Sequence, residues 1–209
     1  MTTYHPRQDN KGKAVLIQHP STPSVREAWA DPNAVATVIP DGWMPASLNG
    51  IGVNAWTNAP RSVNDWATVA GTADIDEPPF SPPSHLRSAA GVVIEEADGR
   101  YWLVAPSNAF GGYTATFPKG TVEQGISLQA AAIMEAYEEA GLRVEILGYL
   151  ADVPRSQSFT RYYRARRVGG NPAEMGWESQ AVHLVPRPRL TEFLTNKNDG
   201  ALLTALGEG

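Results

Sequence analysis

The segment from residue 120 to residue 142 constrains this chain most, because it joins a short apolar helix to a cluster of acids. Glu135, Glu138 and Glu139 stand near the end of that helix. Positions i, i+3 and i+4 share one helix face, where like charges repel by roughly 0.2–0.5 kcal/mol per pair. The carboxyl end of a helix also disfavours anions. A divalent cation among the carboxylates would reverse both penalties, and an oxygen ligand set without Cys favours Mg²⁺ or Mn²⁺ over zinc.

The ends of this helix are also marked in the sequence. Ser127 is suited to cap its start, and Gly141 is suited to end it in the left-handed conformation. Just upstream, Phe117-Pro118-Lys119-Gly120 forms a tight loop that can bring backbone carbonyls and a Lys ammonium beside the acids. The alternative interpretation of the acids is a solvated acidic surface with no ligand.

This pattern resembles the signature of the Nudix hydrolase family, G-x5-E-x7-R-E-U-x-E-E-x-G-U, in which U is aliphatic. The resemblance covers roughly residues 86 to 205. It implies that the fold is an α/β/α sandwich with a mixed sheet. It also implies that the protein hydrolyses phosphoanhydride bonds and depends on Mg²⁺ or Mn²⁺. The residues that match are Gly120, Glu135, Glu138, Glu139, Gly141 and Leu142, with Ala136 a weak match at an aliphatic position.

Two positions depart from that signature: Ile126 replaces its first Glu, and Met134 replaces its Arg. In the family these two residues are thought to pair and fix the loop to the helix. Replacing both members of an ion pair with apolar residues is often neutral, whereas losing one member leaves an unpaired charge. We therefore expect Ile126 to pack on Met134 and keep the loop geometry. The competing interpretation is an inactive homologue that has decayed.

The resemblance also implies roles for individual residues. Glu135, Glu138 and Glu139 would ligate metal together with the carbonyl of Lys119, and Glu135 and Glu138 would be catalytic. Glu178, in the sequence Trp-Glu-Ser-Gln, is similar to a Glu that binds metal or acts as a base in several family members, although Ser replaces the Gly of that context. Its rival is the nearby Glu174, and an ordinary loop Glu is the alternative.

Basic residues suggest how phosphates are held. The Pro-Lys-Gly form of the loop resembles dinucleoside polyphosphate hydrolases, and the Lys119 ammonium is a point charge suited to a phosphate chain. Arg164 and Arg166 share one face of an expected strand over residues 159–168, whose other face carries two further Arg. They form either a substrate-binding wall for a long anion or a solvated basic face.

Composition narrows the remaining classes. The chain has 209 residues, a net charge of −5 and no Cys, so disulfides and thiolate metal sites are excluded and nucleic acid is not expected as the main partner. The polar start shows no signal peptide, and no apolar run reaches the ~18 residues of a membrane span. We expect a cytoplasmic protein that acts on a small phosphorylated molecule, and a homodimer is possible because dimers are common in the family.

A proline-rich connector divides the chain. Residues 77–83 hold four prolines in seven positions, which predicts an N-terminal extension over 1–83 and a Nudix-like domain over 84–209. The extension contains four of the chain's six Trp, too many to leave in water. We expect it to pack on the following domain. The alternatives are that it only completes a core, or that one of its Trp or Tyr stacks on a substrate base.

The remaining pattern predicts alternating strands and helices. In the extension we expect a strand over 13–18, a capping box at Ser24 and Glu27, and a short helix over 62–70. In the domain we expect a hairpin of 87–96 with 100–105, strands over 144–153, 159–168 and 181–185, and helical pieces over 190–194 and 201–206. The histidines lack metal-ligand spacing, and His183 is expected to pack in the last strand.

These observations together predict a pyrophosphatase of the Nudix type. The expected substrate is a nucleoside diphosphate linked to another group, with a dinucleoside polyphosphate first. An ADP-ribose or nucleoside triphosphate pyrophosphatase is the alternative among enzymes. Outside enzymes, the alternatives are a nucleotide-binding sensor that has lost turnover and a structural interaction domain built on the Trp-rich extension.

Overall fold

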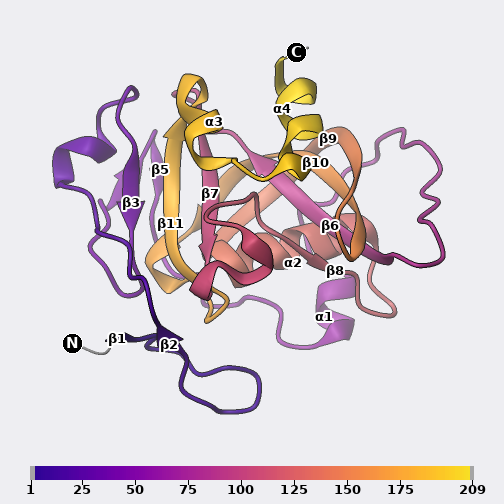
Figure 1. Ribbon diagram of the computed structural model, residues 1–209, viewed down its shortest axis with the longest axis horizontal. Helices are drawn as coiled ribbons and strands as arrows, with labels where there is room; N and C mark the ends of the chain where they lie inside the picture. Colours follow the sequence, from indigo (N-terminus) through magenta and orange to yellow (C-terminus); the bar gives the residue numbers. More distant parts are fainter. Residues whose placement is uncertain (1–2, 208–209) are drawn as a thin grey trace.

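Two larger β-sheets form the middle layer of the protein (Figure 1). A computed structural model describes residues 3–207. One sheet has the strand order β8-β6-β10-β9, in which β10 runs parallel to β6 and the other pairs are antiparallel. Its strands are β6 (Arg87–Ile94), β8 (Lys119–Thr121), β9 (Leu142–Pro154) and β10 (Ser158–Gly170). The other sheet has the order β3-β11-β7, with β3 (Ala36–Val38), β7 (Arg100–Pro106) and β11 (Ser179–Pro186).

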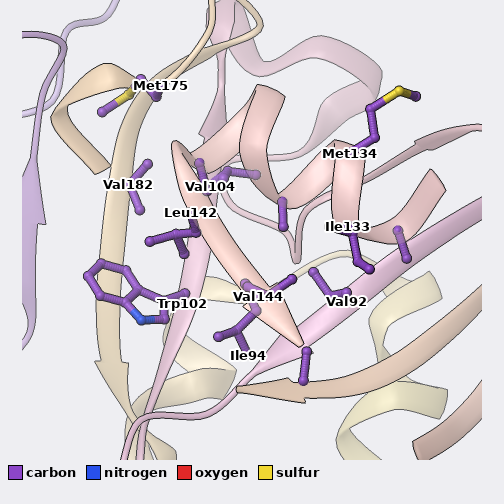
Figure 2. Packing of buried hydrophobic residues seen from close by; sticks show 14 of the residues in the cluster. Val92, Ile94, Trp102, Val104, Ile133, Met134, Leu142, Val144, Met175 and Val182 are labelled. Atoms are coloured by element: carbon purple, nitrogen blue, oxygen red, sulfur yellow. The ribbon is translucent and has the colours of Figure 1, made fainter. Parts of the chain in front are cut away.

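Helices cover both sides of these sheets. On one side lies α2 (Leu128–Ala140), and on the other lie α3 (Leu190–Phe193) and α4 (Gly200–Gly207) (Figure 1). Five buried alanines, at positions 130, 131, 132, 136 and 140, allow α2 to pack closely on the strands. The hydrophobic core between α2 and the strands includes Ile133, Val92, Trp102 and Val104 (Figure 2). The expected α/β/α sandwich with a mixed sheet is thereby confirmed.

A second hydrophobic cluster lies under α3 and α4. Val93 and Tyr162 belong to it, whereas their strand neighbours Val92 and Tyr163 face the α2 side. This alternation follows from the two-residue period of a strand. Both faces of β6 are therefore buried, which explains its continuous run of apolar residues from Ala89 to Ile94.

The N-terminal extension adds a strand to the protein's sheet. Residues 36–38 pair with residues 182–184 of β11, so β3 forms an outer strand. The extension also carries β1 (Thr3–Tyr4), β2 (Leu16–Ile17), β4 (Ser47–Leu48), β5 (Ile51–Gly52) and α1 (Val63–Ala67). Short 3-10 helices complete the structure at Arg26–Trp29, Ser107–Gly112, Pro172–Glu174, Arg187–Arg189 and Lys197–Asp199.

The tryptophans of the extension mostly pack inward. Trp29 is buried against Trp102, with ring centroids 6.2 Å apart. Trp56 and Trp66 form an aromatic cluster with Tyr137 of α2, at 5.3 and 6.0 Å respectively. These three tryptophans are therefore used for packing, whereas Trp43 is exposed.

The expected hairpin of residues 87–96 with 100–105 does not form. The turn at Asp98 and Gly99 is present, but β6 and β7 belong to different sheets and are joined by an isolated bridge between Glu95 and Tyr101. Beyond it, β6 pairs with β10 and β7 pairs with β11. The N–H of Glu96 donates to the carbonyl oxygen of Arg100 at 2.8 Å on the edge of β6 that faces β8, and the N–H of Glu95 donates to Ala165 of β10 on the opposite edge. The buried ion pair of Glu96 with Arg167 joins the end of β6 to β10.

Two expectations within the extension also need correction. The capping box at Ser24 and Glu27 is absent, because the Ser24 hydroxyl accepts from Thr37 N at 2.9 Å and serves β3 instead. A capping box does form at Ser62 and Asp65, where α1 begins. The strand expected over 13–18 is reduced to residues 16–17. No helix within residues 3–207 combines the length and the apolar character that a membrane span requires.

Candidate functional site

The helix that carries the acids is fixed at both ends as the sequence predicts. The Ser127 side chain accepts from Ala130 N at 3.1 Å. Gly141 adopts a φ of 66°, and a Cβ at this position would come within 2.3 Å of the carbonyl oxygen of Asn171. Only glycine therefore fits there, both for its backbone angle and for the close approach of the next segment.

Glu135 and Glu139 lie one turn apart and are buried against the loop before the helix. Gly120 lies so close to Glu135 that a Cβ at Gly120 would come 2.0 Å from Oε1 of that carboxylate. The backbone N–H of Lys119 donates to Oε2 of Glu139 at 2.8 Å. The Pro-Lys-Gly loop and these two acids are thus assembled into one unit, although they are separated by fifteen or more residues in sequence.

Glu138 and Glu178 are exposed at the edge of this unit. The backbone N–H of Gly176 donates to the carbonyl oxygen of Glu138 at 2.7 Å, which fixes the segment before β11 against the end of α2. Glu178 follows two residues later, and its charge is among the causes that raise the pKa of Glu138. The structure therefore brings Glu178 to the acids of α2, whereas Glu174 lies in the preceding 3-10 helix.

Burial and mutual repulsion shift the titration of the whole group. Burial raises the pKa of Glu139 to about 7, partly offset by the Lys119 ammonium. Burial and then the charges of Glu139 and Glu138 raise the pKa of Glu135 well above its ordinary value. The pKa of Glu178 is also raised, because surrounding protein atoms partly desolvate its carboxylate although the residue reaches solvent. Such shifts mark a site in which a positive charge is favourable, because each carboxylate costs less to ionise beside a cation.

The donor set fits a hard divalent cation. Its side chains supply only carboxylate oxygens, and Gly120 leaves the space that the Glu135 carboxylate occupies. The ion pairs formed among residues 3–207 all involve other carboxylates, so no Arg or Lys is in ion-pair contact with the trio. Across the same residues, no three acidic or His side chains already lie at metal-holding distances. The acids therefore supply ligands of the right type without being gathered into a complete coordination site.

One acid of the site is not identified from the sequence. The charge of Glu123 raises the pKa of Glu138, which places this loop residue beside the exposed end of the cluster. The sequence feature that could have identified it is its position, since it is the sole acid between Gly120 and Ile126.

Ile126 and Met134, the two departures from the signature, are both buried in the same hydrophobic cluster, and Figure 2 shows Met134 on α2.

The side chain of Lys119 is directed by a buried polar network. Its Nζ lies 5.5 Å from the centre of the Tyr113 ring, an attractive cation–π arrangement. The Tyr113 hydroxyl accepts from Arg155 Nη1 at 3.2 Å, and Arg155 forms a buried ion pair with Asp199 at 2.6 Å. This network connects the Lys119 loop to the C-terminal segment, and the sequence pattern gives no sign of it.

The structure places Arg164 and Arg166 away from the carboxylates. Arg164 Nη2 donates to the carbonyl oxygen of Ala205 in α4 at 3.3 Å. Arg166 forms an exposed ion pair with Glu145 at 2.7 Å. Both line a cavity of about 390 Å³ beside residues 164–167 of β10, which is also lined by Val93 of β6 and Leu147 of β9. The structure thus does not bring these two arginines together with Lys119.

A comparison with known families decides the identity of the domain. The NUDIX domain family matches residues 85–205, more than half of the chain. The chain belongs to the Nudix hydrolase family. The resemblance expected from residues 86 to 205 is confirmed with nearly the same limits.

The Nudix domain also has curated relatives of similar sequence. RNA pyrophosphohydrolase of Caulobacter vibrioides is 36% identical over 100 residues, which are 47% of this chain and 54% of the relative. RNA pyrophosphohydrolase of Shewanella piezotolerans is 34% identical over 83 residues, which are 40% of this chain and 44% of the relative. The chain thus spans about half the length of the relatives that it matches.

A solved structure shares the fold of the Nudix domain. The crystal structure of a NUDIX hydrolase from Nitrosomonas europaea superposes with a TM-score of 0.50 at 23% identity. The superposition covers 60% of this chain and 73% of that chain. At this identity the similarity establishes the fold alone.

Proposed function

We propose that this Nudix protein hydrolyses a phosphoanhydride bond in a nucleoside diphosphate that is linked to another group, and that it requires Mg²⁺ or Mn²⁺. The main support is the assembly of Glu135 and Glu139 on one turn of α2, against Lys119 and Gly120. A buried pair of carboxylates that forms no ion pair with Arg or Lys is unfavourable for stability alone. A cation bound there during function would offset this cost.

The residues of the site divide the work in this proposal. Glu135 and Glu139 hold the cation, and Glu138 on the exposed edge serves a second ion or its waters. The cation, when bound, neutralises phosphate charge and lowers the pKa of water. Lys119 steadies the phosphate chain with its ammonium group. Glu178, whose pKa is raised, accepts the proton of the attacking water.

Two substrates are favoured by separate observations. The Lys in the Pro-Lys-Gly loop favours a dinucleoside polyphosphate, because its charge suits a long phosphate chain. The RNA pyrophosphohydrolase relatives favour a pyrophosphate group carried on RNA. Both substrates contain linked phosphates attached to a nucleoside. ADP-ribose and nucleoside triphosphates are the remaining candidate substrates. The cytoplasmic location and the homodimer expected from the sequence stay predictions.

The test is a substrate panel with Mg²⁺ or Mn²⁺ in ¹⁸O-labelled water, with products separated by chromatography. We expect cleavage of at least one nucleotide, with label in one product that identifies the attacked phosphorus. The Glu135→Gln variant should lose at least about 100-fold in kcat. The control is Glu145→Gln, which changes an exposed acid paired with Arg166 and should retain activity. Nucleotide binding without turnover would instead favour a sensor, and absence of nucleotide and metal binding would favour an interaction domain.

A further inference from the structure

Phe110 is the most exposed large apolar side chain among residues 3–207, with 82% of its surface accessible. It lies in the segment Ser107–Gly112, which leaves the end of β7. A single exposed apolar residue is ordinary on its own. What distinguishes Phe110 is that nearby residues on both sides of it are anchored: Ser107 and Asn108 before it, and Tyr113 after it.

On the amino-terminal side, the N-terminal extension and the segment of Glu178 hold the chain. Ser107 N donates to the carbonyl oxygen of Glu178 at 2.7 Å, which ties this segment to the candidate active site. Asn108 Nδ2 donates to the carbonyl oxygen of Leu16 at 2.7 Å, and its Oδ1 accepts from Gln18 N at 2.9 Å. Strand β2 and the residue that follows it thus bind Asn108 through two hydrogen bonds.

The fixed backbone has an unusual conformation. Asn108 and Ala109 have φ values of 57° and 51°, both in the left-handed region. Asn tolerates this region, but Ala, with a Cβ and no polar side chain, rarely adopts it. The hydrogen bonds from the extension to Asn108 offset this unfavourable geometry. Together these contacts turn the chain so that Phe110 faces water.

On the carboxyl-terminal side, Tyr113 is buried and joined to Arg155. Lys119 Nζ lies over the ring of Tyr113. Phe110 is three residues from both Ser107 and Tyr113, so its Cα lies within roughly 11 Å of each. The exposed ring is therefore held on a short segment whose two ends contact Glu178 and Lys119, the residues that we assign to water activation and phosphate binding.

We propose that Phe110 is the platform on which the base of the nucleotide substrate stacks, and that the N-terminal extension positions it through Asn108. The inference rests on the function proposed above. A flat aromatic face binds any base with little dependence on sequence. A nucleoside attached to phosphates at Lys119 would bring its base to the rim of the site, where this ring is held. The extension thereby contributes to substrate binding without supplying one of its own aromatic residues.

The experiment compares substrates with and without a base. KM and kcat are measured with Mg²⁺ for the nucleotide that is cleaved best and for inorganic tripolyphosphate, which has no base. For Phe110→Ala we expect KM for the nucleotide to rise about tenfold, with values for tripolyphosphate unchanged. Phe110→Trp should retain the wild-type KM. Asn108→Gly can still adopt the left-handed backbone conformation but loses both side-chain hydrogen bonds, so its KM for the nucleotide should rise by less than in Phe110→Ala. Leu147→Ala is the matched control, because Leu147 is also exposed, at 55%, but lies in β9.

A binding measurement separates this inference from the proposed function. Adenosine diphosphate and inorganic pyrophosphate are titrated without metal into the wild type and Phe110→Ala, followed by NMR. Weaker binding of adenosine diphosphate alone in the variant supports the platform, whether or not hydrolysis occurs. Equal binding and equal KM in the two proteins would overturn it, as would the same change for both ligands. Loss of a dimer in Phe110→Ala, measured by sedimentation with KM unchanged, would assign Phe110 to a subunit interface instead.

Discussion

Gly120 of β8 lies directly against the carboxylate of Glu135 on α2, so that no side chain fits between them. A Cβ at Gly120 would come within 2.5 Å of both carboxylate oxygens. The signature glycine is therefore required for space at this position, since its φ is not in the left-handed region. The position of the buried acid depends directly on the absence of a side chain in the neighbouring strand.

The Gly120→Ala variant should lose activity more than stability. The methyl group displaces the Glu135 carboxylate, and a displacement of about 1 Å in a catalytic site can reduce the rate by about 100-fold. Isothermal titration with Mn²⁺ should show weaker metal binding in parallel. The control is Gly148→Ala in β9, where an added Cβ meets nothing within 4 Å. Equal kinetics for the two variants would contradict this role of Gly120.

Removing the charge of Glu139 should stabilise the metal-free protein at high pH. Its pKa rises from 4.5 to about 7 in the folded state, so the folded protein holds this proton more tightly than the unfolded chain. The resulting stability is complete below pH 4.5 and is lost as the pH rises through about 7. In urea with a chelator, Glu139→Gln should exceed the wild type by about 1–3 kcal/mol at pH 8, and match it near pH 4.5. A difference independent of pH would refute the assignment.

His183 should produce the opposite dependence on pH. Burial lowers its pKa from 6.5 to about 4, so the unfolded chain takes up the proton first as the pH falls. Its contribution is present above pH 6.5 and is lost toward pH 4. His183→Asn loses some packing on Phe193 at every pH, so the informative quantity is the slope of stability between pH 4 and 6.5. The variant is made in the Glu139→Gln background, which removes one of the opposing contributions. There, stability should rise less steeply with pH when His183 is replaced than when it is present. An equal slope with and without His183 would show that His183 does not contribute to it.

Ile126 and Met134 should be coupled in stability. Both are buried, so Ile126→Glu or Met134→Arg alone places an unpaired charge in the core and should destabilise by about 3 kcal/mol. The double variant restores the pair of the family signature and should be less damaged than the sum of the two, by at least about 1 kcal/mol. Urea unfolding of the four proteins gives the coupling energy. Additive effects would mean that the two side chains act independently.

Glu178 and Glu174 can be distinguished by paired variants. Glu178→Gln should reduce kcat by about 10² to 10⁴ if this carboxylate is the general base, with little loss of stability because the side chain is exposed. Glu174→Gln, three residues before Trp177 in the same segment, is the control and should retain kcat. The pH profile of kcat should lose its acidic limb in Glu178→Gln alone. Equal turnover in both variants would remove Glu178 from the proposed mechanism.

The sequence by itself determined the features that depend on local geometry. The spacing of Glu135 and Glu139 fixes a shared helix face, and Ser127 and Gly141 fix the ends of that helix, because each effect acts within one or two helical turns. The tertiary structure decided the rest. The buried pair of Arg167 with Glu96, the separation of β7 from β6, and the arrival of Glu178 beside Glu138 all join distant parts of the chain. Such contacts depend on which buried charges form ion pairs and which strand edges pair with each other. These pairings are determined only when the whole core is packed.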